Sequence, residues 1–352
     1  MEDKSSIQIP KSNAWGKIKE WFFKKLRLTD NPAVKLYEGF GNPGHCQVFG
    51  HALTLGPLPR KKYRNIFLFN TLAVLRLFMV KPIKSASIRL FFNDITLDTK
   101  TEKDGFFKFE WNNPVPLKPG KYKVSARLAH KSGKFFIAEA HAEIDIPHPS
   151  KFAFISDIDD TFLISHSGNL RKRLYVLLTE NARSRDPFEG VVNHYTLLSH
   201  AGALPELDNS FFYVSSSEWN LYEYIREFIE VHKLPQGVLL LSQMKSFSGV
   251  FKTGQNNHKT KFMRIVRILE AFPDQNFILL GDDTQEDPNI YASVIEHFPG
   301  QIFCVYIRMV SQKPKAAVEE RLREIVKAGT LICYFRHSAE AVIHSKANGI
   351  IA

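Results

Sequence analysis

Acidic side chains crowd together at one point of the chain, residues 157–160. Asp157, Asp159 and Asp160 stand within four positions, directly after the apolar run Phe152–Ser156, and Thr161 follows them. Carboxylates this close repel one another unless a cation neutralises them or one of them is protonated. The pattern predicts a metal site or an acid–base site at the end of a buried strand.

Two other apolar runs also end in polar residues that could do chemistry. A second acidic run, Asp282 to Asp287, comes after Phe277–Leu280, and Ser215 comes after Phe211–Val214. A hydroxyl group can hydrogen-bond a substrate oxygen, and the second set of carboxylates could complete a metal site.

A lysine near the start of a helical pattern supplies the fourth group. We favour Lys259 because it opens the pattern, with Lys252 and Lys261 as the competing candidates. Each of the four groups alone is a weak signal. Their order along the chain, acids, hydroxyl, lysine and second acids, rarely arises by chance.

The elements that carry these groups alternate between strand and helix from residue 149 onward. This rhythm predicts an α/β Rossmann-like parallel sheet, in which the carboxyl ends of the strands meet at one edge and bind the ligand. The predicted strands are Phe152–Ser156, Phe211–Ser215, Val238–Leu241, Phe277–Leu280, Ile302–Ile307 and Leu331–Tyr334. The predicted helices are Glu189–Leu198, Trp219–His232, Lys259–Phe272, Ile290–His297 and Ala316–Lys327.

The preceding residues have a different pattern. Short alternating apolar runs separated by Gly, Pro and Asn turn signals predict an antiparallel β-sandwich. Residues 13–28 predict a basic amphipathic helix. We therefore expect an N-terminal helix within residues 1–30, a β-sandwich domain at 31–148 and the α/β domain at 149–352.

The composition is that of a folded intracellular protein. The 352 residues are 44% hydrophobic and 24% charged, which is enough for two domains with cores. The three cysteines lack CxxC spacing, which argues against a disulfide scaffold or a structural zinc site. The polar start predicts no secretory signal, and the longest apolar run, Ile66–Val80, is too short to span a membrane. We expect a cytoplasmic protein.

Positive charge is concentrated in the first 150 residues, which hold 25 Lys and Arg against 13 Asp and Glu. This excess predicts an anionic partner. The helix at 13–28 sets Trp15, Ile18 and Phe22 on one face, which suits either a peripheral contact with anionic lipid or docking on the sandwich. No nucleic-acid recognition motif is present, so we expect no nucleic-acid partner, and the sequence does not identify a protein partner of the sandwich.

Together the four groups resemble the motifs of the haloacid dehalogenase phosphatase superfamily, which match Asp157, Asp159, Thr161, Ser215, Lys259, Asp282 and Asp287. The runs DIDDT, YVSSSEWNLY, HKTKFMRIVRILEAFPDQNFILLGDDTQEDPNIY and VYIR further resemble the catalytic domain of the actin-patch-protein family of magnesium-dependent phosphatidate phosphatases. A β-rich domain before it is similar to the arrangement in bacterial members.

This resemblance implies hydrolysis of phosphatidate to diacylglycerol and phosphate. Asp157 would attack phosphorus and form an aspartyl-phosphate, and Asp159 would protonate the leaving alkoxide and then activate water. Ser215 would hydrogen-bond a phosphoryl oxygen, and Lys259 would neutralise its charge. The implied ligands of Mg²⁺ are Asp157, the main-chain carbonyl of Asp159, Asp282 and Asp287.

Three polar neighbours, Thr161, Asp160 and Asp283, have less defined roles. Asp160 is expected to hydrogen-bond within a turn. Asp283 departs from the family pattern, in which a small residue is expected, and this leaves open whether Asp282 or Asp283 binds the metal.

The substrate is expected to be large or held at a surface. Only 53 residues separate Thr161 from Ser215, so no long cap domain covers the site. Arg171, Lys172 and Arg173 are expected to contact an anionic phospholipid headgroup at a membrane surface. Two alternatives stay open: the same chemistry on a soluble or protein phosphate, and an interaction protein with a vestigial phosphatase site.

Overall fold

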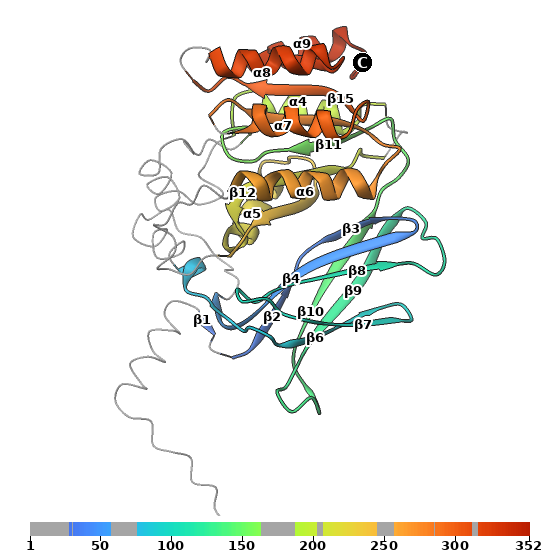
Figure 1. The fold of residues 1–352 in the computed structure, drawn as a ribbon, viewed down its shortest axis with the longest axis vertical. Helices are drawn as coiled ribbons and strands as arrows, with labels where there is room; N and C mark the ends of the chain where they lie inside the picture. The colour runs from blue at the N-terminus through green and yellow to red at the C-terminus, as the bar shows by residue number, and fades with distance from the viewer. Residues whose placement is uncertain are drawn as a thin grey trace, which may run out of the picture.

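The computed structural model describes residues 28–29, 31–57, 76–162, 187–202, 207–244, 257–284, 286–311 and 316–352. They form two sheets, a ten-stranded sheet in the N-terminal unit and a six-stranded sheet in the parallel-sheet unit (Figure 1). The predicted helix at 13–28 and the basic residues Arg171, Lys172 and Arg173 lie outside the described residues.

The N-terminal unit consists, in chain order, of β1 (Leu28–Thr29), β2 (Ala33–Leu36), β3 (Gly39–Asn42), β4 (His45–Pro57), η1 (Arg76–Phe78), β5 (Lys81–Pro82), β6 (Ser87–Phe92), β7 (Ile95–Lys100), β8 (Phe106–Asn112), β9 (Gly120–Ala129) and β10 (Phe136–Ile146). The spatial order is β1-β4-β3-β10-β9-β6-β7, and β2, β5 and β8 also pair with β4. Neighbouring strands are antiparallel except β3 and β10.

Alternate residues of these strands are buried. In β6, Ile88, Leu90 and Phe92 are buried while the residues between them are more exposed, and β8 shows the same period of two. Cys46 and Val48 of β4 join the same apolar core. The strands form one hydrogen-bonded network, connected through the long strand β4, and share this core. The predicted sandwich arrangement of these strands stays a prediction.

The parallel-sheet unit consists of β11 (Phe152–Ser156), α4 (Val191–Ser199), β12 (Phe211–Glu218), η2 (Trp219–Leu221), α5 (Tyr222–Val231), β13 (Gly237–Ser242), α6 (Asn257–Ala271), β14 (Asn276–Asp282), α7 (Asp287–His297), β15 (Ile302–Arg308), α8 (Ala316–Lys327), β16 (Leu331–Phe335) and α9 (Ser338–Ala347). The strand order is β13-β12-β11-β14-β15-β16, and every neighbouring pair is parallel.

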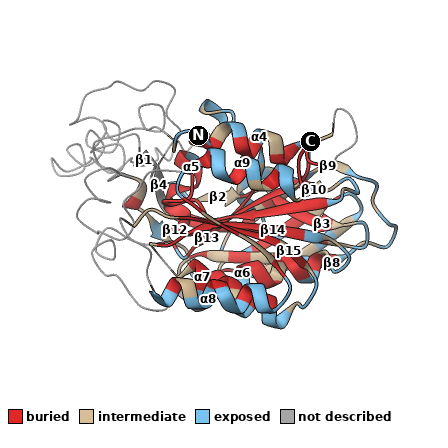
Figure 2. Ribbon diagram, turned by 90° about the horizontal axis from the view of Figure 1, so that it is seen from above, coloured by how far each residue is buried: buried red, intermediate tan, exposed pale blue. Residues whose placement is uncertain are grey.

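Helices cover both faces of the parallel sheet. Figure 2 shows the sheet between a layer with α4, α5 and α9 and a layer with α6, α7 and α8. The central strands β11 and β14 are buried almost throughout, as expected for strands covered on both faces. This burial explains why their sequences are continuous apolar runs.

The two units share one apolar core. Tyr37, Phe40, Phe49 and Leu53 of the N-terminal unit belong to the same buried cluster as the parallel sheet. The ring of Tyr37 stacks on Trp219 with centroids 4.1 Å apart, and its hydroxyl group lies 3.0 Å from His51 Nδ1. We call the rings of Tyr37, Phe49, His51 and Trp219 the aromatic contact.

Among the described residues, no helix is long and apolar enough to cross a membrane.

Candidate active site

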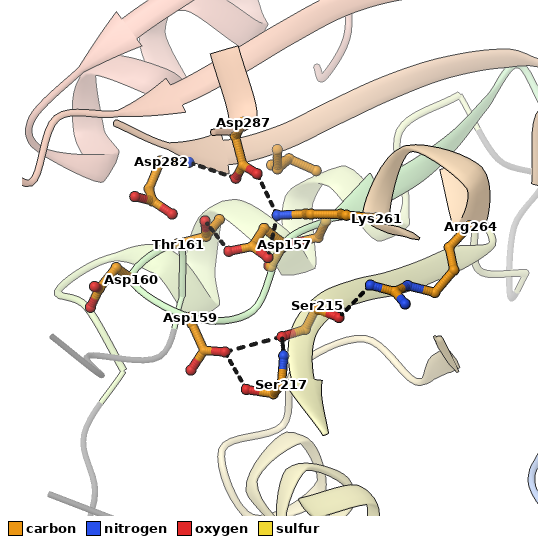
Figure 3. Close-up of polar contacts among 12 residues, drawn as sticks. Asp157, Asp159, Asp160, Thr161, Ser215, Ser217, Lys261, Arg264, Asp282 and Asp287 are labelled. Carbon is orange, nitrogen blue, oxygen red and sulfur yellow. Dashed lines mark hydrogen bonds and ion pairs between the residues drawn. The ribbon is translucent and has the colours of Figure 1, made fainter. Parts of the chain in front are cut away.

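Three strands that end in polar residues lie side by side in the parallel sheet. Strand β11 pairs with β12 on one side and with β14 on the other. The N–H of Asp157 donates to the carbonyl oxygen of Leu280 in β14, 2.8 Å away. Because the strands are parallel, their carboxyl ends bring both acidic runs and Ser215 to one edge (Figure 3).

Asp157 is buried and paired with a buried lysine. Lys261 Nζ lies 2.6 Å from Asp157 Oδ1 and also contacts Asp287 Oδ1. Burial alone would lower the pKa of Lys261, but the carboxylates of Asp157 and Asp287 outweigh burial and raise it. Lys261 is therefore charged at neutral pH.

Asp282 completes a group of three carboxylates with Asp157 and Asp287, which we call the acid cluster. One oxygen from each residue lies within 4.8 Å of the others. Asp282 Oδ1 accepts a hydrogen bond from the N–H of Thr284 at 2.5 Å, whereas Oδ2 is buried without a hydrogen-bond partner among the described residues. An oxygen left in this way is available to a metal ion.

The acid cluster carries more negative charge than its lysine balances. Burial, followed by the charge of Asp287, raises the pKa of Asp282 to about 8. Burial also raises the pKa of Asp157, opposed by Lys261 and supported by Asp287 and Asp282. Three ionised carboxylates beside one ammonium group would leave two negative charges, which a divalent cation could neutralise.

Gly281 makes room for Asp287. A Cβ atom at position 281 would lie 2.5 Å from Asp287 Oδ2 and 2.9 Å from the hydroxyl oxygen of Tyr291. The N–H of Asp282 donates to the same Asp287 oxygen at 3.2 Å. Only glycine lets Asp287 lie this close to the end of β14.

Asp159 faces the hydroxyl groups at the end of β12 rather than Lys261 (Figure 3). Its Oδ2 atom accepts hydrogen bonds from Ser215 Oγ at 3.0 Å and Ser217 Oγ at 2.5 Å. The N–H of Ser217 donates to Ser215 Oγ at 2.8 Å. The side chain of Asp159 is therefore held apart from the acid cluster, by two hydroxyl groups.

The other polar residues of the first acidic run support its turn. Thr161 Oγ1 donates to Asp157 Oδ2 at 3.3 Å. Asp160 has a φ of 60° and is buried, and its Oδ2 atom lies 3.5 Å from the hydroxyl group of Thr284 in the second acidic run. Asp160 thus occupies a turn, as we expected, and connects the two acidic runs.

Asp283 has contacts quite unlike those of its neighbour Asp282. Its Oδ1 atom accepts from the N–H groups of Val310 at 2.9 Å and Ser311 at 3.1 Å, and its Oδ2 atom accepts from the Tyr334 hydroxyl at 2.9 Å. These bonds fix the chain after β15. The hydrogen bonds of Asp283 therefore favour Asp282 over Asp283 as a metal ligand.

The lysine that contacts Asp157 is Lys261, which we had considered as an alternative to Lys259. Lys259 lies in the first turns of α6, but its side chain is outside the described residues, so its role stays a prediction. Lys261 is four residues before Ile265 and seven before Ile268, which are both buried. This helical spacing could have identified Lys261 from the sequence.

Two buried arginines at the site were missed by our sequence analysis. Arg264, one turn after Lys261, donates to the carbonyl oxygen of Ser215 at 3.1 Å. Arg308, at the end of β15, donates to the carbonyl oxygen of Thr161 at 2.8 Å. Burial lowers the pKa of each guanidinium group to about 10, so both stay charged at neutral pH. They fix the end of β12, which carries the hydroxyl groups, and the turn that carries the first acids.

Comparison with known proteins matches the segment of the chain that contains this site to a protein family. Residues 152–309 match the family model described as the catalytic domain of phosphatidate phosphatase APP1. Phosphatidate phosphatase APP1 of Saccharomyces cerevisiae is 31% identical over 166 residues, which are 46% of this chain and 27% of that protein. An uncharacterized protein of Schizosaccharomyces pombe is 22% identical over 213 residues, 60% of this chain and 34% of that protein.

The matched segment is therefore similar to a hydrolase domain that acts on phosphate monoesters. Within that class, the similarity is to the catalytic domain of phosphatidate phosphatase APP1. The chain spans 27% and 34% of the lengths of these two relatives, and the N-terminal unit precedes the segment matched by the family model.

Solved structures give only distant likenesses. A carbohydrate acetylesterase from Xanthomonas citri has a TM-score of 0.29 at 10% identity, covering 88% of this chain and 67% of that chain. A β-glucuronidase from Ruminococcus gnavus has a TM-score of 0.27 at 8% identity, covering 88% and 53%.

Proposed function

We propose that this protein is a Mg²⁺-dependent phosphatidate phosphatase of the haloacid dehalogenase type, which releases phosphate and diacylglycerol. The observation that carries the proposal is the buried contact of Lys261 with Asp157 and Asp287, beside Asp282, inside the segment that matches the phosphatidate phosphatase APP1 catalytic domain. A buried carboxylate held by a lysine at a strand end is poised to act as a nucleophile.

The acid cluster fits Mg²⁺. It offers oxygen ligands only, it includes the Oδ2 atom of Asp282, which has no hydrogen-bond partner among the described residues, and its three carboxylates, once ionised by metal binding, would exceed the charge of Lys261. Asp157, Asp282 and Asp287 would hold the ion together with the main-chain carbonyl of Asp159. Bound Mg²⁺ would supply positive charge to the phosphoryl oxygens.

The side chains of this protein would carry out the reaction in two steps. A carboxylate oxygen of Asp157 attacks phosphorus, the bond from phosphorus to the ester oxygen breaks, and Asp159 gives its proton to the leaving alkoxide. Asp159 then takes a proton from water, which attacks the aspartyl-phosphate and frees Asp157. Ser215 and Ser217 orient Asp159 for both transfers.

Lys261 favours the ionised form of Asp157 against the effect of burial and holds it in place, because its ammonium group contacts both Asp157 and Asp287. This assigns to Lys261 the charge-neutralising role that we first expected of Lys259. Thr161 adds a hydrogen bond to the other oxygen of Asp157. Ser215 would move its hydroxyl hydrogen bond from Asp159 to a phosphoryl oxygen when substrate binds.

The proposed substrate is an anionic phospholipid at a membrane surface, and Arg171, Lys172 and Arg173 would contact its headgroup. A cytoplasmic protein that associates peripherally with membranes fits this substrate. The excess of positive charge in residues 1–150 supports an anionic surface as partner.

The test is phosphate release from phosphatidate in mixed micelles, with Mg²⁺ or with EDTA, beside a soluble aryl phosphate. We expect Mg²⁺-dependent release that strongly favours the lipid. Equal turnover of the soluble compound without a response to micelles would show a phosphatase for soluble or protein phosphates. No turnover of either compound with Mg²⁺ would contradict the proposed activity and favour an interaction protein with a vestigial site.

A further inference from the structure

The hairpin between β9 and β10 carries exposed apolar side chains at its tip. It protrudes from the N-terminal unit, at the end of β10 that is remote from the parallel sheet (Figure 1). Seven consecutive residues, Lys131 to Ile137, are exposed. Phe135, Phe136 and Ile137 are 55%, 39% and 38% exposed. Contiguous apolar side chains at a protruding tip mark an interaction surface.

Local contacts hold the tip in this exposed form. Gly133 has a φ of 72°, and its N–H donates to the carbonyl oxygen of His130 at 2.8 Å. The N–H of His130 in turn donates to the carbonyl oxygen of Phe135 at 2.8 Å. The ring of His130 stacks on Phe135 with centroids 4.5 Å apart. The turn is thus hydrogen-bonded across the hairpin, and the ring of Phe135 is fixed beside it.

Phe136 is held by cations of the neighbouring strands. The guanidinium groups of Arg89 and Arg127 lie 5.9 Å and 5.7 Å from its ring centroid. Together with the ring of Phe91, whose centroid is 6.2 Å away, these cations fix the ring of Phe136 at the surface of the sheet. The exposure of the apolar side chains is therefore built into the hairpin.

The charge around the tip is positive. Lys131 and Lys134 flank the turn, and no acidic residue lies between His130 and Ile137. Two acids of the same sheet are paired with arginines, Asp98 of β7 with Arg89 at 2.8 Å and Glu139 of β10 with Arg127 at 3.0 Å. The tip thus presents apolar side chains directly after two lysines.

A cavity of about 410 Å³ lies beside the tip, lined by Arg89, Lys100, Ala129, Gly133 and Phe136 together with Asp98 and neighbouring strand residues. Its strand side carries Lys100 and the ion pair of Arg89 with Asp98, and its hairpin side carries the ring of Phe136. A phospholipid headgroup, with a phosphate beside an apolar glycerol and acyl region, matches this combination of chemistry.

We propose that the β9–β10 tip docks this protein on a lipid surface that contains anionic headgroups. The side chains of Phe135, Phe136 and Ile137 enter the interface, and Lys131 and Lys134 contact headgroup phosphates. A stable protein partner needs some 20–30 residues on each side, many more than this tip offers. Aromatic rings next to lysines are suited instead to the boundary between headgroups and acyl chains.

This docking is independent of the proposed hydrolysis. The tip shares no residue with the acid cluster. The tip lies at the start of β10, whereas β11 and Asp157 follow the other end of this strand. Binding can therefore be measured on a lipid that a phosphomonoesterase cannot hydrolyse, so a failure of one proposal does not imply a failure of the other.

The experiment is sedimentation of the full chain with vesicles of phosphatidylcholine alone, or with about one-third phosphatidylglycerol, a phosphodiester. We expect binding to the anionic vesicles, and a loss of at least about tenfold in the partition coefficient for the double variant Phe135→Ser/Phe136→Ser. Lys131→Gln/Lys134→Gln should lower binding to anionic vesicles about thirtyfold, because each lysine contributes about 1 kcal/mol near such a surface.

The matched control is Ile343→Ser, which removes an exposed apolar side chain from α9 in the other unit and should leave binding unchanged. Unchanged binding of both double variants, or an equal loss in Ile343→Ser, would overturn the proposal. A tip variant that alters the mass of the lipid-free protein but not vesicle binding would also overturn it, because the tip would then be a protein–protein contact. Unchanged thermal unfolding of each variant verifies that the fold is intact.

Discussion

The segment from Ser215 to Trp219 separates two buried regions of opposite chemistry. On one side Ser215 and Ser217 donate to Asp159, beside the acid cluster. On the other side, two residues further along, Trp219 stacks on Tyr37 of the N-terminal unit. Burying charge costs free energy unless a partner or metal compensates for it, whereas burying rings stabilises a fold. The comparison indicates that the charged region serves the reaction and the aromatic contact keeps the segment in place.

Helix α6 connects the same two regions in a second way. Lys261 and Arg264 face the acids and the end of β12, while Arg267 lies over the ring of Phe49, 5.4 Å from its centroid. Asn42 of the N-terminal unit donates to the carbonyl oxygen of Ala271 at the end of α6 at 2.8 Å. The N-terminal unit thus contacts both the segment from Ser215 to Trp219 and helix α6. These are the two elements whose polar groups face the first acidic run.

The largest effect is expected from Asp157→Asn. Loss of the nucleophile should lower phosphate release by at least about 10⁴-fold, because the covalent step is removed. The melting temperature should change by only a few degrees, since the amide keeps the shape of the side chain. Phosphate assays and thermal unfolding check both, with the variant Asp274→Asn, at an exposed position after α6, as a control. Turnover that survives the substitution would exclude Asp157 as the nucleophile.

Replacing Lys261 should have the next largest effect and separates it from Lys259. Lys261→Met should lower kcat about 10²-fold to 10³-fold, because Asp157 and Asp287 lose their shared cation. Lys259→Met, two positions earlier in the same helix, serves as the matched variant and should change kcat much less. Steady-state kinetics on phosphatidate decides, and the reverse order of effects would restore Lys259 to the role that the family resemblance implied.

Disturbing the aromatic contact should change stability more than chemistry. Tyr37→Ala should lower the free energy of unfolding by about 3 kcal/mol, since it leaves a cavity against Trp219. Its kcat at a temperature where it is folded should fall by less than about tenfold. Tyr37→Phe keeps the ring and should cost about 1 kcal/mol, through loss of the hydrogen bond to His51. Urea unfolding of the two variants measures the difference between their unfolding free energies. Equal losses of unfolding free energy would show that stacking of the ring on Trp219 does not stabilise the fold.

The smallest expected effect is a loss of stability at acidic pH that is caused by His51. Burial, with Lys35 adding to it, lowers the pKa of His51 from 6.5 to about 3, so the folded state keeps this side chain neutral. As pH falls below about 6.5 the unfolded chain binds a proton that the folded chain does not, and stability should fall by up to about 1.4 kcal/mol per pH unit. His51→Gln should remove this slope.

The measurement is unfolding free energy against pH between about 6.5 and 5 for the wild-type protein and His51→Gln. Taking the difference between the two proteins cancels the contributions of His194, whose pKa is also lowered to about 3, and of the acid cluster. A difference that does not change with pH would mean that His51 takes up a proton in the folded state.

Much of the parallel-sheet unit could be predicted from the sequence. Its strands are uninterrupted apolar runs because helices cover both faces, and such runs stand out between amphipathic helices. All six predicted strands occur in the structure, within a few residues of the expected bounds. Helix α9 was missed because its small and polar residues form no clear apolar stripe.

Other features depend on tertiary contacts that local patterns do not encode. The acids Asp282 and Asp283 are adjacent and chemically identical, and only the donors from Val310, Ser311 and Tyr334 separate their roles. Strand β4 contains Gly50 and Gly56 and pairs with strands on both edges, so it lacks simple alternation. The stacking of Tyr37 on Trp219 joins residues far apart in sequence, which no periodicity indicates.

The measurement that tests the central claim most directly is the position of a bound metal in crystals grown with Mn²⁺, which substitutes for Mg²⁺ at oxygen-ligand sites. Anomalous difference density should show one strong peak at the acid cluster in the wild-type protein and in Asp283→Asn, and none there in Asp282→Asn. No peak at the cluster in the wild-type protein, or a peak that persists in Asp282→Asn and disappears in Asp283→Asn, would contradict our assignment of the metal site.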